Sequence, residues 1–286
     1  MKADEGIQSC NHQGLQALCP LTSAFICGSK PFKRSKQAVR STLTTTALVL
    51  GIGLAGTALA HHPWVLTDPG QTEAGASVRV MPFFGHEFPF DEAMRLDRIA
   101  ELVLLSADGE RFDIDPTDAN TPPLPAGVHV VALRQARGYW SQTTEGGRAQ
   151  PRSELQNVVS CGYSDNGART LIVVGDGGPS AAGQALGHRL EILTDANMAR
   201  LAEGDLVRFR VLLEGHAHAG PVMAFNVDSG EDPWLVSESD RNGQVELRLE
   251  GSGPWMVMAQ GEIDYPDPAR CDVERFTSSL SFGHNS

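Results

Sequence analysis

The chain has 286 residues and a net charge of −12 at pH 7, and all four of its lysines fall within the first 60 residues. Residues 61–286 carry 17 arginines against 33 acidic residues, a net charge of −16. A net charge this negative repels the polyanionic backbone of nucleic acid, which excludes nucleic acid as a partner. The 226 residues after position 60 are enough for one large or two modest hydrophobic cores.

Residues 1–60 have the pattern of an export signal. Residues 30–40 (KPFKRSKQAVR) are basic, residues 42–59 carry no charge, and Ala58-Leu59-Ala60 fits the small-x-small pattern that signal peptidase cleaves. The apolar core of about a dozen residues is short for a bilayer, which needs about 20, although an uncleaved anchor is the alternative. We expect a signal peptide with an extended n-region at 1–60, a periplasmic protein that starts at His61, and no stable membrane insertion after cleavage.

Short apolar or alternating runs, broken by glycine, proline and aspartate, predict β-strands along the mature chain. These runs lie at 77–84, 100–114, 127–134, 169–176, 188–193, 205–215, 221–227, 243–251, 253–261 and 275–282. Asp108-Gly109, inside the second run, predicts a hairpin turn. The helix candidates, 91–98 and 197–202, are short, so we expect an all-β protein.

Residues 175–187 (GDGGPSAAGQALG) are small and lack periodicity, which is typical of a linker or a long surface loop. A boundary there predicts two β-sandwich-like domains, at 61–185 and 186–286. The second would have about seven strands, a number compatible with an immunoglobulin-like or transthyretin-like topology.

Two cysteines, Cys161 and Cys271, remain after the predicted cleavage. In an oxidising compartment they are expected to form a disulfide that ties distant parts of the chain together. Two separate free thiols are the alternative.

Cleavage after Ala60 would place two histidines at the start of the mature chain. The α-amine of His61, the amide of His62 and the His62 imidazole can close fused chelate rings around square-planar Ni²⁺ or Cu²⁺. Alternatively, His61 binds through its own amine and ring nitrogen and is joined by a distant histidine in a T-shaped copper site. A third interpretation is that cleavage exposes two surface histidines without a ligand role.

Three internal histidines are further candidate ligands. His216 and His218, in EGHAHAG, are two residues apart, so both imidazoles can project to one side of a strand end. A water-exposed hairpin turn explains this pair equally well. His86 lies beside Glu87 among aromatic residues, where a hydrogen-bonded structural role is the alternative.

The other histidines and the rest of the sequence favour binding over catalysis. His129 and His188 fall within strand patterns, which favours structural roles, and His284 lies beside the C-terminus. The mature sequence contains no glycine-flanked nucleophilic serine, no HExxH and no phosphate-binding glycine loop. We therefore do not expect an enzyme.

Six segments, taken in their order, carry a family resemblance: His62-Pro63-Trp64, GHEFP at 85–89, LDRIAELVLLSADGE at 96–110, LGHRLEIL at 186–193, GDLVRFRVLLEGHAHAGPV at 204–222 and RFTSSLSF at 275–282. In these segments the chain resembles the NikK-like family of exported proteins, which is associated with nickel and cobalt uptake. The resemblance implies a periplasmic β-sandwich protein that delivers metal to the membrane component of an importer of the energy-coupling-factor type. It supports His62 and His86 most, and residues 214–222 depart from it, because relatives usually have a lysine-proline turn there.

Together, the residues and the resemblance predict a periplasmic protein that binds Ni²⁺ or Co²⁺, with Cu²⁺ as the further candidate. The predicted ligands are His61, His62, His86, His216 and His218.

Two other functions stay open. One is a copper carrier or oxidative enzyme built on a histidine brace at His61. The other is a carbohydrate-binding or adhesive β-sandwich without metal, which a flat exposed row of tryptophans would support. The tryptophans in question are Trp64, Trp140, Trp234 and Trp255.

Overall fold

The structure, a computed structural model, describes residues 61–283. The predicted signal peptide and His284 lie outside these residues. The described part of the chain contains seventeen strands and three single 3₁₀ turns, which confirms the predicted all-β class. Within the same range, no helix has the length and apolar character needed to cross a bilayer.

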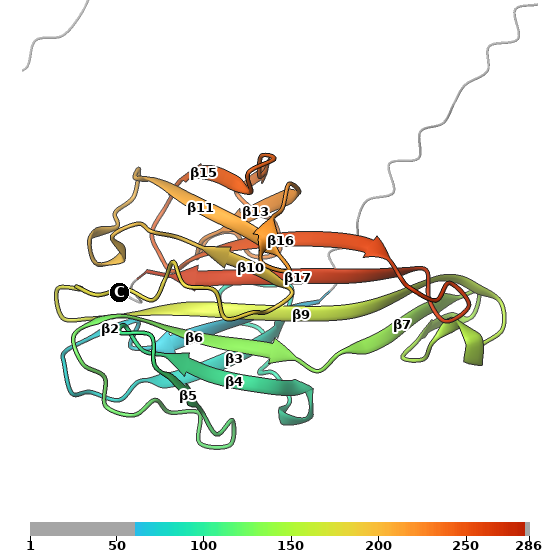
Figure 1. The fold of residues 1–286 in the computed structure, drawn as a ribbon, viewed down its shortest axis with the longest axis horizontal. Coiled ribbons are helices and arrows are strands. Elements are labelled where there is room, and N and C mark those ends of the chain that lie inside the picture. The colour runs from blue at the N-terminus through green and yellow to red at the C-terminus, as the bar shows by residue number, and fades with distance from the viewer. Residues whose placement is uncertain (1–60, 284–286) are drawn as a thin grey trace, which may run out of the picture. The chain divides into compact units, whose positions relative to one another are not determined.

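Eleven strands form a central sheet (Figure 1). Its main path runs through β14 (Leu235–Glu238), β13 (Pro221–Phe225), β16 (Trp255–Asp264), β17 (Val273–Phe282), β9 (Val158–Val174), β6 (Gly127–Gln135), β4 (Ile99–Leu105) and β5 (Arg111–Asp113). β2 (Gln71–Thr72) and β7 (Gly138–Thr143) pair with β9, and β8 (Gly146–Arg148) pairs with β7. β9 runs parallel to β17 and β2 and antiparallel to β6 and β7.

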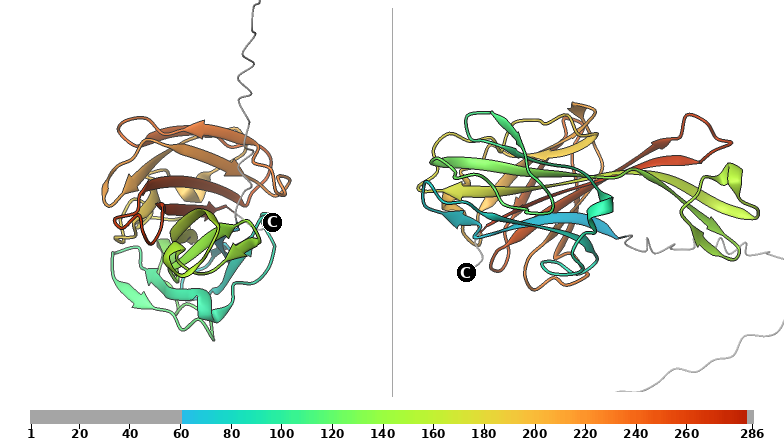
Figure 2. Two further views of the ribbon diagram at one scale, coloured as in Figure 1. Left: turned by 90° about the vertical axis from the view of Figure 1, so that its right-hand side faces the viewer. Right: turned by 90° about the horizontal axis from the view of Figure 1, so that it is seen from below.

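Two smaller sheets cover the faces of the central sheet, and Figure 2 gives two further views of the arrangement. One has four strands: β10 (Leu190–Leu193), β11 (Leu206–Leu213), β12 (His216–Ala217) and β15 (Gln244–Arg248). The other is the antiparallel ribbon of β1 (His62–Asp68) and β3 (Arg79–Gly85).

Strand alternation explains why both faces of the central sheet need a cover. In β16, Trp255 and Val257 join a hydrophobic cluster that includes Phe209 of β11, whereas Met256 and Met258 join a second cluster with Trp64 of β1. Successive side chains on a strand point to opposite faces, so a strand that is apolar at consecutive positions is buried on both.

The predicted domain boundary at 185/186 separates strands that lie in one sheet and share one hydrophobic core. β9 and β17 lie on opposite sides of the boundary and pair over nine residues, from Gly162↔Val273 to Thr170↔Ser281. One hydrophobic cluster contains both Val103 and Phe209. The described residues lie within one compact unit, so the structure joins the two predicted domains through a common sheet and core.

Several local predictions can be compared with the structure. Gly109 has a φ of +93° in the turn between β4 and β5, which confirms the predicted hairpin. The two helix candidates contain single 3₁₀ turns, Leu96–Arg98 and Met198–Arg200. The sequence patterns missed β1, β2, β7, β8, β12, β14 and the first half of β9.

The first half of β9, together with β7, β8 and the facing ends of β16 and β17, projects beyond the layers (Figure 1, right). Cys161 in β9 and Cys271 before β17 form the predicted disulfide, with a Cα–Cα distance of 5.0 Å. Three tyrosine rings, Tyr139, Tyr163 and Tyr265, contact one another beside it.

Replacement of both Cys161 and Cys271 by serine is expected to lower the free energy of unfolding by about 3 kcal/mol. The disulfide links residues 110 positions apart and so restricts the unfolded chain. Urea unfolding of the oxidised wild type, the reduced wild type and the double-serine variant measures the effect. Equal free energies for all three would contradict this expectation.

Candidate functional site

His61 and His86 come together at the end of the β1–β3 ribbon. The antiparallel register pairs His62 with Gly85, so the residue before β1 and the residue after β3 lie opposite each other. Their imidazole rings are 4.0 Å apart between centroids and are tilted by 55°. His61 is exposed and His86 is half-buried, so solutes can reach the pair.

The backbone around His86 is fixed by Asp91. One carboxylate oxygen, Oδ2, accepts the N–H of His86 at 2.7 Å and that of Glu87 at 3.0 Å, and Oδ1 accepts the N–H of Glu92 at 2.7 Å. The bonds from Glu87 and His86 hold the pKa of Asp91 below its ordinary value, against a weaker opposing effect of burial. A Cβ at Gly85 would collide with this carboxylate, so a larger residue there would displace Asp91 from the turn.

Phe84 of β3 contacts His61. Its ring is stacked with that of His61, with centroids 5.4 Å apart and an interplanar angle of 19°. The Arg98 guanidinium carbon also lies 4.6 Å from the Phe84 centroid. The His61 ring is therefore held against an aromatic side chain as well as beside His86.

His62 points the other way, into the protein. Its side chain is 2% exposed, and its ring packs against Trp64 at 5.5 Å and Phe225 at 6.1 Å between centroids. A chelate through the His62 imidazole would require this ring to leave the core. Because successive side chains along a strand point to opposite faces, His62 is separated from the pair formed by His61 and His86.

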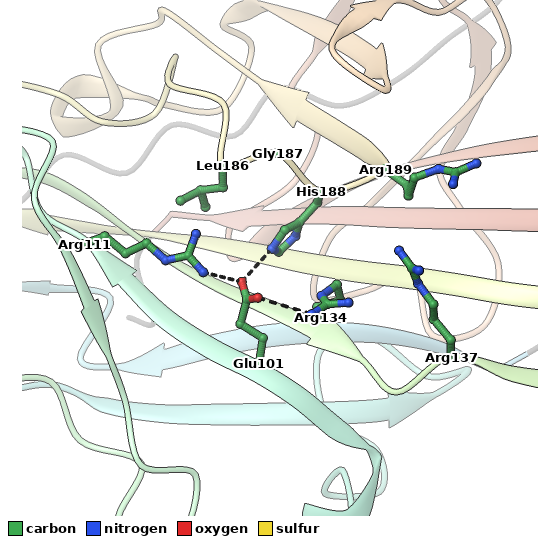
Figure 3. Close-up of a pocket in the computed structure, with 8 residues that line it drawn as sticks. All are labelled: Glu101, Arg111, Arg134, Arg137, Leu186, Gly187, His188 and Arg189. Carbon is green, nitrogen blue, oxygen red and sulfur yellow. Dashed lines mark hydrogen bonds and ion pairs between the residues drawn. The ribbon is translucent and has the colours of Figure 1, made fainter.

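A second polar site is a cavity of about 200 Å³ between the central sheet and the segment that precedes β10 (Figure 3). We call it the arginine-lined cavity, because four arginines line it: Arg111, Arg134, Arg137 and Arg189. Arg111 Nη2 lies 2.9 Å from Glu101 Oε1, and Arg134 Nη2 lies 3.5 Å from Oε2. His188 Nε2 is 3.1 Å from Glu101 Oε1. Burial raises the pKa of Glu101, but His188 and the two arginines outweigh it, so the pKa lies below its ordinary value.

A buried ion pair supports the wall of this cavity. Arg169 and Glu191 are each 1% exposed in their side chains, and Arg169 Nη1 lies 3.2 Å from Glu191 Oε1. Burial lowers the pKa of Arg169 to about 10, although the charge of Glu191 opposes this. Glu191 also accepts the backbone N–H groups of Leu186 and Gly187, at 2.7 and 3.1 Å. The pair therefore fixes the segment that leads to His188.

The sequence matches a family model, described as a domain of unknown function (DUF4198), over residues 58–263. The chain belongs to the DUF4198 family. The match covers most of the chain, including both the histidine pair and the arginine-lined cavity. No curated protein matches the sequence.

In this DUF4198 protein the remaining predicted ligands lie elsewhere. His216 is exposed in β12. His218 is half-buried, and a Cβ at Gly220 or Gly261 would lie about 3 Å from its Nε2. Among residues 61–283, no group of three or more histidine, cysteine, aspartate or glutamate side chains is arranged to hold a metal ion.

His129 fits the structural role predicted for it. It is completely buried, its Nδ1 accepts the N–H of Ala107 at 3.1 Å, and its Nε2 lies 2.8 Å from the carbonyl oxygen of Pro125. His188 is not in a strand as the pattern suggested, because β10 begins at Leu190.

The tryptophans do not form an exposed row. Trp64 and Trp255 are 0% and 5% exposed, Trp234 is half-buried, and Trp140 is 55% exposed. These four tryptophans therefore give no support to a carbohydrate-binding surface.

The arginine-lined cavity was missed at the sequence level. Its polar residues lie at positions 101, 111, 134, 137, 188 and 189, which span almost 90 residues and share no motif. One signal was available: every basic side chain after residue 60, histidine aside, is an arginine.

The Arg169→Leu variant is expected to lose about 3–5 kcal/mol of unfolding free energy, because it leaves Glu191 charged and buried without its partner. Arg208→Leu is the matched control, since Arg208 pairs with Glu246 at an exposed site and should lose at most about 1 kcal/mol. Urea unfolding of both variants makes the comparison. Equal losses would show that Arg169 contributes no more than a surface pair.

Proposed function

We propose that the protein, once cleaved between Ala60 and His61, binds a divalent transition-metal ion outside the cytoplasmic membrane. The ligands would be the α-amine of His61, its imidazole and the imidazole of His86. The observation that carries this proposal is the 4.0 Å approach of the two imidazole rings.

The donor set indicates which metals would bind. An amine and two imidazoles are nitrogen ligands, which suit Cu²⁺, Ni²⁺ and Co²⁺, whereas Ca²⁺ and Mg²⁺ prefer oxygen. The amine and ring of one N-terminal histidine form a single chelate, and a second histidine completes a three-nitrogen set for a tetragonal or square-planar ion. Affinity for such a set is expected to rise in the order Co²⁺, Ni²⁺, Cu²⁺.

Capture and handover is the role that we propose for this site. Three nitrogen ligands leave coordination positions open, as befits an ion that must be passed on. The resemblance to NikK-like proteins supports Ni²⁺ or Co²⁺ as cargo and the membrane component of an importer as the receiving partner.

A copper protein is the second candidate, and the same histidine pair favours it. An N-terminal histidine joined by a second imidazole is the arrangement expected of a histidine brace. Paramagnetic resonance of the Cu²⁺-loaded protein distinguishes a three-nitrogen axial site from adventitious copper, and competition between Ni²⁺ and Cu²⁺ decides the preferred cargo.

Metal titration of residues 61–286, with the free His61 amine confirmed by mass spectrometry, tests the proposal. The protein is expected to bind one Ni²⁺ or one Cu²⁺ ion per chain. A glycine added before His61, or the His86→Ala substitution, is expected to weaken binding at least tenfold, a loss of about 1.4 kcal/mol. The added glycine moves the free α-amine away from the His61 ring, and His86→Ala deletes one of the two imidazole ligands.

Two further variants serve as controls. His216→Ala removes an exposed histidine remote from the proposed ligands and should bind as the wild type does. His62→Phe keeps an aromatic ring in the core and should also retain binding, whereas a chelate through His62 would lose it. Unchanged affinity in both the extended protein and His86→Ala would overturn the proposal.

A further inference from the structure

The arginine-lined cavity carries excess positive charge beside Glu101. Arg111 and Arg134 share this one carboxylate, so the pair keeps one uncompensated positive charge. The other two arginines of the cavity have acidic partners of their own: Arg137 pairs with Asp165, and Arg189 with Glu214 and Glu274. The excess charge is therefore local to Arg111 and Arg134, within a chain whose net charge is −12.

The hydrogen-bond donors around Glu101 also outnumber its acceptors. A carboxylate offers about four lone-pair positions, whereas two guanidinium groups alone carry ten N–H donors. His188 adds a ring nitrogen 3.1 Å from Glu101 Oε1. Glu101 cannot use all these donors, so the cavity retains donors that can bind a second anionic group.

The cavity wall is fixed by buried structure. The buried pair Arg169–Glu191 holds the backbone of Leu186 and Gly187, and His188 follows directly with 8% exposure. Gly167 of β9 gives the His188 ring its space, because a Cβ there would lie 3.2 Å from His188 Nδ1. His188 is thus positioned before any ligand arrives.

We propose that this cavity binds a small anion with carboxylate or phosphate groups, held by Arg111, Arg134 and His188. A volume of about 200 Å³ is below the range of roughly 300–1,000 Å³ for drug-sized ligands, so the group that it encloses must be small. The planar guanidinium fork matches both carboxylate and phosphate oxygens. Glu101 acts as an internal competitor, since it occupies part of the same donor set.

Isothermal titration with inorganic phosphate and with succinate, at constant ionic strength, tests the proposal on residues 61–286. The wild type is expected to bind at least one of the two probes at one site per chain. Arg111→Gln and Arg134→Gln should each weaken that binding at least fivefold. Glu101→Gln should strengthen anion binding at least threefold, because the substitution removes the competing carboxylate and frees the arginine and histidine N–H groups that Glu101 occupies.

The control variant is Arg275→Gln, which breaks an exposed arginine–glutamate pair with Glu262 outside the cavity and should bind as the wild type does. Circular dichroism confirms that each variant folds. Binding of phosphate alone, or of succinate alone, identifies the ligand group. No binding of either probe, or an equal effect of chloride at the same ionic strength, would overturn the proposal. So would Glu101→Gln binding no more tightly than the wild type.

Discussion

The parallel pairing of β9 with β17 is the constraint on which the rest of the structure depends. Parallel strands need a long crossover connection, and here the chain between Val174 and Val273 provides it. That crossover contains the four-stranded covering sheet as well as β13 and β16, which extend the central sheet. Because the central sheet is apolar on both faces, its second face must be covered as well, and the ribbon of β1 and β3 does this.

The same constraint determines where residues 61–64 lie. Ser279 of β17 donates its hydroxyl to the carbonyl oxygen of Pro63 at 2.8 Å, and the Trp64 indole donates to the carbonyl of Pro89 at 2.8 Å. With β1 held from Pro63 onward, His62 fills the core and His61 is directed to the end of the ribbon beside His86. The alternation of a buried strand thus assigns the two adjacent histidines to different environments.

The sequence pattern was sufficient for the all-β class and for the Cys161–Cys271 disulfide, because strand runs, turn residues and cysteine count are local or compositional signals. It was insufficient for β7, β8 and the start of β9, whose polar and glycine residues lie in a projection with little apolar burial. Residues 175–187 have the composition of a linker, although Ala181 and Ala182 are buried in the common core. The approach of His61 to His86 depends on the register of β1 against β3, which no motif encodes.

The surroundings of the histidine pair bear on which cation the proposed site would select. Asp91 accepts three backbone N–H groups, from His86, Glu87 and Glu92, so its carboxylate is engaged in the turn that places His86. An acidic surface attracts any cation, but attraction alone does not distinguish Ca²⁺ or Mg²⁺ from a transition metal. A pair of imidazoles beside an occupied carboxylate offers nitrogen rather than oxygen, and discrimination among cations would then come from ligand chemistry instead of net charge.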